Sequence, residues 1–579
     1  MRTSGLDLRR LIFVIVLLLL PVAVSPSSVA SSISASRPAE QWVLQQARNG
    51  KPANLKDKFT RETDRVVGAS FLKQVLTSDP ARTGIRAYGI RISHARVLGE
   101  LDLTNEEIPY YVTLDDCFFD EDLTLVNAHF KKSLHLERSV FECFADLRYL
   151  VIDGDLEARG VQFDLADLEP LDKDGKLRPM SFEGMKVGGP LFLSRAVFKR
   201  PVNFYAAQIG GNFVADDEAH FESDAVFELM KIGARAVFDK AKFDGRTSFY
   251  SVKVAENFDA SEAYFNDTKH GVIFEGMSVD AALFSGSHFK GPARFYGMTA
   301  SSSLDLSGVD FYKVTEDMAT DDQAKNDKIT AFVNFQGMAI KGSFFLRRSI
   351  FNRGVSFYGT SVDREFSADA AQFNDPQSGV FFNNLKTDTI GLSGAVFRGP
   401  ISLSGVTYRE VDRDSLDNLV SVIRQANYDA GAYFELEAYY RTHGAISQAD
   451  DVYIEQRRRE RRGLWFPARW SEALFVDLPL GYGRHIWRLI VPSAILIGIG
   501  CYVFRSKELM EPQAPEYACR HYSRFLYSLG LFLPIVDLRS DVWLPKHERR
   551  AARRYLPFHI IAGWVLVTLL VGALTGILK

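Results

Sequence analysis

The stretch GVIFEGMSVDAALFSGSHFKGPARFYGM, residues 271–298, decides the fold because it belongs to a repeat. Phe274 and Phe295 stand at equivalent positions of that repeat, 21 residues apart. The position recurs from about Met180 to Val406, at Phe182, Phe204, Phe227, Phe249, Phe274, Phe295, Phe335, Phe357, Phe382 and Leu403. Successive steps are 21 to 25 residues, apart from one step of 40 that contains a polar insertion at 313–330. A fixed period of this length predicts a repeat architecture.

Two further apolar columns run in register with the first. The second, mostly Ala-x-Phe, is at Phe198, Phe221, Phe243, Phe265, Phe289, Phe311, Phe351, Phe373 and Phe397. The third follows each member of the first column by about ten residues, at Phe213, Phe258, Phe284, Phe366 and Leu392. One coil cannot bury its own Phe, whereas coils stacked about 4.8 Å apart bury each ring between its neighbours. The sequence therefore predicts a mainly β protein, a right-handed parallel β-helix with coils of about 22 residues.

Small residues stand two positions before the second column, where we expect tight corners: Ala196, Ala219, Ala241, Ala263, Ala371 and Ala395. From Ile85 to Thr407 the period leaves room for about fourteen coils. This Ala-x-Phe texture resembles the pentapeptide-repeat proteins, whose A-(D/N)-L-x-x units wind into right-handed β-helices. The resemblance implies the same kind of helix here.

The amino-acid composition argues against several classes of function. The chain has 579 residues, 24% of them charged, and a net charge of −3, which argues against nucleic-acid binding because that needs a strongly basic face. It has four cysteines and neither a C-x-x-C pair nor an H-E-x-x-H motif, so we expect no zinc site and no cofactor. Cys117 and Cys143 are 26 residues apart, close to one coil step. They are either two small core residues, which we favour, or a disulfide between adjacent coils, which requires export.

The N-terminal segment reads as a secretory signal over residues 1–30. Three arginines precede a 14-residue apolar run from Leu11 to Val24, and Ser28 and Ala30 supply small residues for cleavage. Residues 31–84 are expected to form an N-terminal helical cap, with helices over 41–47 and 63–76, because the open end of a solenoid must be covered. The β-helix is then expected over residues 85–410.

Residues 411–485 change to helical patterning. Helices are expected over 412–427, over 433–443 with Gly444 as the C-cap, and over 447–462 with Ser447 as the N-cap. The last two resemble the pair of helices in a tetratricopeptide unit. We expect them to cap the solenoid and to dock it on a membrane. The arginines at the end of the third helix are candidates for contact with lipid headgroups: Arg457, Arg458, Arg459, Arg461 and Arg462. Trp465, Trp470 and Trp487 are candidates for the membrane interface.

Two transmembrane helices are expected, over residues 486–504 and 557–578. The loop between them, residues 505–556, carries ten Lys and Arg residues. The positive-inside rule places this loop in the cytoplasm, and the β-helix therefore on the periplasmic side of a bacterial cytoplasmic membrane. The signal segment requires the same orientation independently. Within the loop, residues 525–536 are apolar but too short to cross, and are expected to be re-entrant or interfacial.

The layout resembles a family of uncharacterised bacterial membrane-anchored β-helix proteins. The cues are ARVLGELDL at 95–103, LPIVDLRSDVW at 533–543 and the terminal LTGILK. Some members carry an automatic oxidoreductase label, but the chain has no G-x-G-x-x-G after a strand, no C-x-x-C and no haem motif. The junction GYGRHIWR, residues 481–488, is similar to that of pentapeptide-repeat proteins fused to two-span ion channels. No T-V-G-Y-G filter lies between the expected spans.

These features favour a non-enzymatic, membrane-anchored scaffold or recognition surface. Its expected partners are anionic lipid headgroups and an envelope protein or glycan. A channel-like or transport-associated protein is the first alternative. An enzyme acting on envelope polysaccharide is the second, because acidic clusters occur at Asp115/Asp116, Glu121/Asp122, Asp216/Asp217/Glu218 and Asp321/Asp322. Outward solenoid positions must be polar, so we interpret these clusters as solvated surface. The insertion at 313–330 is the better candidate for a binding face.

Overall fold

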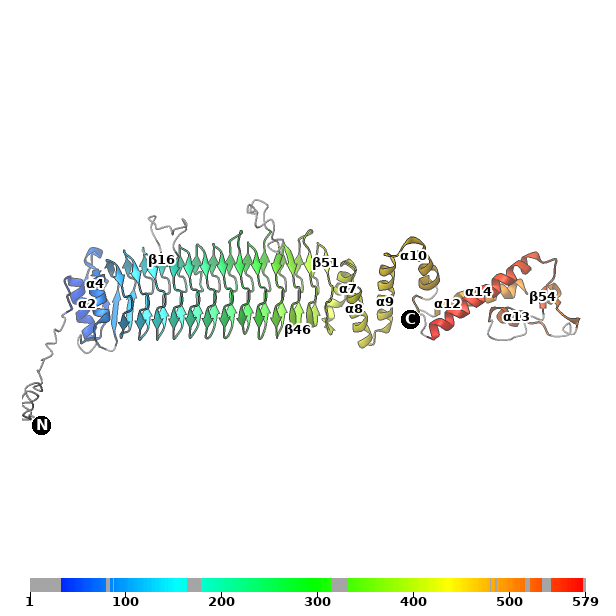
Figure 1. Cartoon of the computed structure of the whole chain (residues 1–579), viewed down its shortest axis with the longest axis horizontal. Helices are drawn as coiled ribbons and strands as arrows, with labels where there is room; N and C mark the ends of the chain where they lie inside the picture. The colour runs from blue at the N-terminus through cyan, green and yellow to red at the C-terminus, as the bar shows by residue number, and fades with distance from the viewer. Residues whose placement is uncertain are drawn as a thin grey trace, which may run out of the picture. The chain divides into compact units, whose positions relative to one another are not determined.

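The computed structural model describes residues 33–79, 84–86, 88–142, 144–163, 179–313, 332–478, 481–484, 487–515, 521–533 and 543–575. The fold is a parallel β-solenoid of about 13 turns with helices at its C-terminal end (Figure 1). The coils have the predicted length of about 22 residues, and the number of turns is one fewer than the expected fourteen or so. The chain divides into two compact units, Met1–Val237 and Phe238–Lys579, which are described separately. The expected signal over residues 1–30 lies outside the described residues.

A typical coil is built from four two-residue strands joined by tight corners. In the first unit one coil consists of β21 Val202–Asn203, β22 Gln208–Ile209, β23 Phe213–Val214 and β24 His220–Phe221. In the second unit an equivalent coil consists of β33 Val272–Ile273, β34 Ser278–Val279, β35 Ala282–Leu283 and β36 His288–Phe289. Every strand pairs in parallel with its equivalent in the next coil, as β36 does with β40 Asp310–Phe311. The strands are short because the chain turns after every buried side chain.

The corners differ from expectation in one detail. The residue with left-handed backbone is the one before the small alanine: Arg195 has a φ of 59°, and Ala196 after it is fully buried. The same holds at Lys240, with a φ of 57°, and Ala241. The alanine is small because its side chain points into the core beside the ring of the next strand, while the corner itself accepts larger exposed residues.

The predicted aromatic ladders are confirmed within each unit. In the first unit Phe198 and Phe221 stack with ring centroids 5.0 Å apart. In the second unit Phe289 and Phe311 stack at 4.9 Å, and Phe311 and Phe351 stack at 4.8 Å. The last pair flanks the long step of the repeat, so the insertion leaves the ladder intact. Stacking at the inter-strand spacing gives each ring apolar contact on both faces.

The N-terminal cap contains the helices α2 Pro38–Asn49, α3 Leu55–Lys58 and α4 Ala69–Thr77. It also contains two strands that the sequence did not predict. β1 Ala53–Asn54 pairs with β3 Ile90–Ser93, and β2 Val66–Gly68 pairs with β4 Arg96–Leu98. The expected helix over 63–76 was therefore wrong in its first half. The β-branched pair in β2 satisfies the open edge of the first coil, which a helix cannot do.

Three helices follow the last coil: α7 Leu416–Gln425, α8 Ala430–Thr442 and α9 Ile446–Arg461. Polar side chains around α7 bind backbone groups of the terminal coils. Gln425 Nε2 donates to the Phe397 carbonyl at 3.0 Å, and Ser415 Oγ accepts the N–H of Leu392 at 2.8 Å. Gly444 follows α8 with a φ of 73°, as expected for a helix end. The predicted Ser447 cap was wrong, because α9 begins at Ile446 after Ala445.

The C-terminal region contains α10 Phe466–Glu472, α12 Trp487–Val503, α13 Arg524–Phe532 and α14 Arg550–Leu574, with a hairpin of β53 Met510–Pro512 and β54 Trp543–Pro545. Among the described residues one helix, Arg550–Gly572, is long and apolar enough to cross a membrane. The apolar helix α12 has 17 residues, fewer than the roughly 20 that a span needs. The expectation of two spans is therefore supported for one helix only.

Candidate functional site

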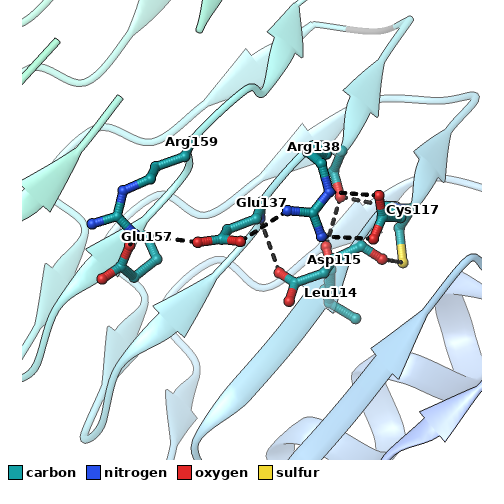
Figure 2. Close-up of polar contacts among 9 residues, drawn as sticks. Leu114, Asp115, Cys117, Glu137, Arg138, Glu157 and Arg159 are labelled. Atoms are coloured by element: carbon teal, nitrogen blue, oxygen red, sulfur yellow. Dashed lines mark hydrogen bonds and ion pairs between the residues drawn. The ribbon is translucent and has the colours of Figure 1, made fainter. Parts of the chain in front are cut away.

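The most connected polar cluster lies on one corner of the early coils in the first unit (Figure 2). Arg138 makes a bidentate pair with Asp116 of the preceding coil, at 2.8 and 2.9 Å. It also contacts Glu137 at 3.0 Å. Arg159, one coil further on, contacts Glu137 at 3.2 Å and Glu157 as well. Carboxylates and guanidiniums thus alternate along the stack, and each arginine links two coils.

The contacts of this cluster link neighbouring coils of the solenoid. Burial raises the pKa of Asp115, whose Oδ1 accepts the Glu137 N–H at 2.9 Å. Burial also raises the pKa of Glu157, although Arg159 opposes the shift. A general acid must release its proton toward a substrate. Here the Asp115 carboxyl binds a backbone N–H and the Glu157 carboxyl binds a guanidinium, so both are engaged within the fold.

Cys117 lies at the edge of the same cluster and is a free, buried cysteine. Its backbone N–H donates to Ser139 Oγ at 2.9 Å, and strand register pairs Phe118 with Val140. Ser139 is therefore the residue of the next coil that faces Cys117. This contact favours the interpretation of Cys117 as a small core residue over the disulfide alternative. Cys143 itself lies outside the described residues.

We predict that Cys117 does not react with thiol reagents in the native protein. Burial raises its pKa to about 12, so the thiolate that reacts is scarce, and the side chain is 1% exposed. The measurement is peptide mapping after alkylation of native protein, with denatured protein as the control. Rapid native labelling of Cys117, or its recovery in a disulfide, would contradict the structure.

Three of the five arginines at the end of α9 contact other parts of the chain, which the sequence does not indicate. Arg458 and Arg461 both contact Asp477, each at 2.9 Å. Arg459 donates to the Arg424 carbonyl. The sequence could not show this, because Asp477 follows the run by fifteen residues or more and only the turn through α10 brings it back. Contact with lipid headgroups remains a proposal for these side chains.

The remaining two arginines of the run are on the exposed side. Arg457 lies over the ring of Tyr453 at 5.4 Å and contacts Glu460 at 3.2 Å. Arg462 is the C-cap residue of α9 and is exposed. Arg462 is the C-terminal member of the run, and we expect it to meet an anionic surface most readily.

We predict that Asp477→Asn lowers stability by about 2 kcal/mol, because it leaves two guanidiniums without their carboxylate. Burial disfavours the Asp477 carboxylate, but hydrogen bonds from Arg458 and Arg461 outweigh burial and lower its pKa. The folded pKa is thus below the unfolded value of about 3.9, so the contribution is complete above that pH and is lost as pH falls through the folded pKa. Hydrogen exchange of residues 466–477 and a pH series of thermal melts test this. The exposed Asp414→Asn variant is the control, and equal effects of the two would contradict the prediction.

The aromatic residues expected at the membrane interface are all exposed. Trp465 is 72% exposed, Trp470 63% and Trp487 60%, and Phe466 beside them is 73% exposed. Apolar side chains on the outward faces of α12 and α14 are exposed as well, for example Ile490, Ile495, Tyr502, Ile561 and Trp564. Exposed apolar side chains in such numbers are typical of a surface that is covered by another phase or another molecule.

Helices α12, α13 and α14 pack closely around a buried polar group. His559 and Ser528 are both fully buried. Ser528 Oγ donates to the Ile497 carbonyl at 2.9 Å, and His559 Nε2 lies 3.0 Å from the Ser528 carbonyl. A carbonyl only accepts, so Nε2 carries the proton, and Nδ1 is left to accept from the Tyr555 hydroxyl at 3.2 Å. Ser528 Oγ also lies 3.2 Å from His559 Nε2, so the two side chains join the three helices through one hydrogen-bond network.

The other acidic clusters named from the sequence stay on the surface. Asp217 contacts Arg195 at 3.6 Å, and Asp122 accepts the Phe144 N–H at 3.0 Å. Asp321, Asp322 and nearly all of the 313–330 insertion lie outside the described residues. In the part of the chain that the structure describes, no group of three or more His, Cys, Asp or Glu side chains is placed to hold a metal ion.

Comparison of the chain with protein-family models, with curated proteins and with solved structures found no match.

Proposed function

We propose that this chain is a non-enzymatic scaffold of the bacterial envelope, anchored in the cytoplasmic membrane and displaying its β-solenoid as a recognition surface on the periplasmic side. The observation that carries the proposal is the exposed apolar surface that begins at Trp465 and continues over α12 and α14. Water is a poor solvent for such a surface, and a bilayer is a good one. The resemblance to membrane-anchored β-helix proteins supports the same conclusion.

The proposed anchor is a hairpin of α12 and α14, with α13 packed between them on the cytoplasmic side of the bilayer. Close packing supports treating the three as one body, because a Cβ on Gly563 would lie 2.3 Å from the Phe532 carbonyl oxygen. Small residues at such contacts are typical of helices in membranes. The ten basic residues of the 505–556 loop support its cytoplasmic placement.

Carbonate extraction of membranes from cells that express the full chain tests the anchor. The wild-type chain is expected in the membrane pellet. The double variant Ile561→Arg and Val565→Arg is expected to leave it, because each central arginine costs about 2.5–3.5 kcal/mol in a span. Val396→Arg, at an exposed position of the solenoid, is the matched control. Release of the wild-type chain by carbonate would rule the anchor out.

A further inference from the structure

One corner of the solenoid in the second unit carries a regular row of exposed tyrosines. The row follows the strands β29 Thr247–Ser248, β37 Ala293–Arg294 and β45 Gly354–Ser356, which are alternate members of one sheet. Its members are Tyr250, Tyr296 and Tyr358, with Glu275 and Gln336 at the same position of the intervening coils. We call these five residues the tyrosine edge.

Backbone hydrogen bonds fix the order along the tyrosine edge. The N–H of Ser251 donates to the Glu275 carbonyl at 2.8 Å, and that of Gly276 donates to the Tyr296 carbonyl at 2.9 Å. Further along, the N–H of Gly337 donates to the Tyr358 carbonyl at 2.9 Å. Each tyrosine is therefore two coils from the next, which is about 9.6 Å at the usual inter-strand spacing.

The rings stand out from their surroundings. Tyr250 is 46% exposed, and Tyr296 and Tyr358 are each 54% exposed, whereas the Phe before each of them is buried. The residue after each tyrosine is small: Ser251, Gly297 and Gly359, all with positive φ. Nothing lies within 4 Å of a Cβ built on Gly297 or Gly359. The solenoid core does not need these tyrosines, since the buried Phe next to each one already fills the coil.

The chemistry of the edge fits a sugar chain better than a protein. An aromatic face attracts the axial C–H groups of a pyranose, because the face is negative and the C–H groups are positive. Amide and carboxylate groups between the rings, at Gln336 and Glu275, suit sugar hydroxyls. Gln336 Nε2 donates to Ser356 Oγ at 2.9 Å, so the Gln336 amide is already oriented. A protein-docking surface would be enriched in apolar anchors with a buried centre, and this edge has neither.

We propose that the tyrosine edge binds an extended β-linked polysaccharide, with one tyrosine for each disaccharide. Two coils of the solenoid are about as long as one disaccharide of such a chain, so successive rings meet equivalent sugars. An α-linked chain that coils does not keep this register. This inference rests on the proposed recognition function and names its ligand. At the equivalent position of the first unit stand Glu183 and, one coil further on, Tyr205.

The test uses the full chain in detergent micelles and measures retention on insoluble polysaccharides. Cellulose, chitin and peptidoglycan sacculi supply β-linked chains, and starch granules supply an α-linked one. The variant is the triple change Tyr250→Ser, Tyr296→Ser and Tyr358→Ser. The matched control is Tyr264→Ser with Tyr312→Ser, which removes two tyrosines of similar exposure, 39% and 40%, from another sheet.

The wild-type chain is expected to be retained on at least one β-linked matrix and to pass through starch. The triple variant is expected to bind on the order of 100-fold more weakly, because three aromatic rings no longer stack on the sugars. The control pair and a triple Tyr→Phe variant, which keeps the rings, are expected to bind as wild type does. Equal retention of the triple serine variant, retention on starch, or no retention on any matrix would overturn the inference. Membrane extraction of the same variants reports on the anchor separately, so failure of one proposal is distinguishable from failure of the other.

Discussion

Replacing Phe289 by alanine is expected to destabilise the solenoid by about 3–5 kcal/mol. The ring is fully buried and stacks on Phe265 at 4.8 Å and on Phe311 at 4.9 Å. It also meets Phe295 edge-on at 6.2 Å. Removing it leaves a cavity between two coils that cannot collapse, because the strand pairing on both sides holds the coils at a fixed spacing.

Denaturant unfolding of the full chain, followed by circular dichroism, measures this effect. Phe381→Ala is the matched control: its ring is 37% exposed, so its loss is expected to cost less than about 1 kcal/mol. A solenoid is held together by contacts between neighbouring coils, so the coils near Phe289 are also expected to lose hydrogen-exchange protection first. A cost for Phe289→Ala no greater than that for Phe381→Ala would contradict the aromatic ladder.

Gly500→Leu is expected to separate the three C-terminal helices. A Cβ at Gly500 would lie 2.1 Å from Ser528 Oγ and 2.9 Å from His559 Cε1, closer than real Cβ contacts. The leucine must therefore push α12 away from α13 and α14, and the hydrogen bonds of Ser528 and His559 break with the contact. Overpacking and the two unsatisfied polar groups together are expected to cost more than about 3 kcal/mol.

Gly498→Leu is the matched control, because nothing lies within 4 Å of a Cβ built there. The measurement is thermal unfolding in detergent together with hydrogen exchange of α13. Loss of α13 protection in Gly500→Leu alone is the expected result. Equal behaviour of the two variants would mean that the helices do not pack as the structure has them.

The solenoid could be predicted from the sequence because the same side chain recurs at the same place in every coil. Phe204 and Phe227 each say little alone, but ten equivalents at one period leave few other folds. The elements that break the period were predicted less well. Val66–Gly68 has helical neighbours on both sides, and only the open edge of the first coil makes it a strand. Local patterning carries no information about that edge.

At the candidate sites, the sequence could predict the exposure of single residues. It could not predict contacts between residues that lie far apart in the sequence. Trp465, Trp470 and Trp487 lie between the arginine run of α9 and the apolar part of α12. Their exposure could be predicted from that position alone. The partners of Arg458 and Arg461 could not be predicted, because the carboxylate of Asp477 reaches them through a turn of the chain. Tyr after every second Phe of the first column, at Tyr250, Tyr296 and Tyr358, was present in the sequence. Only the structure shows that the corners place these side chains on the surface, where a ligand can reach them.

The most direct test of the account is side-specific cysteine labelling in intact cells whose outer layer has been permeabilised. The chain would carry Lys253→Cys on an exposed strand of the solenoid and its native Cys519 in the basic loop, with Cys143 and Cys501 replaced by alanine. The account predicts that an impermeant maleimide labels Cys at position 253 in intact cells and Cys519 only after lysis. Labelling of Cys519 in intact cells, with position 253 protected until lysis, would contradict a membrane-anchored solenoid displayed outside the cytoplasm.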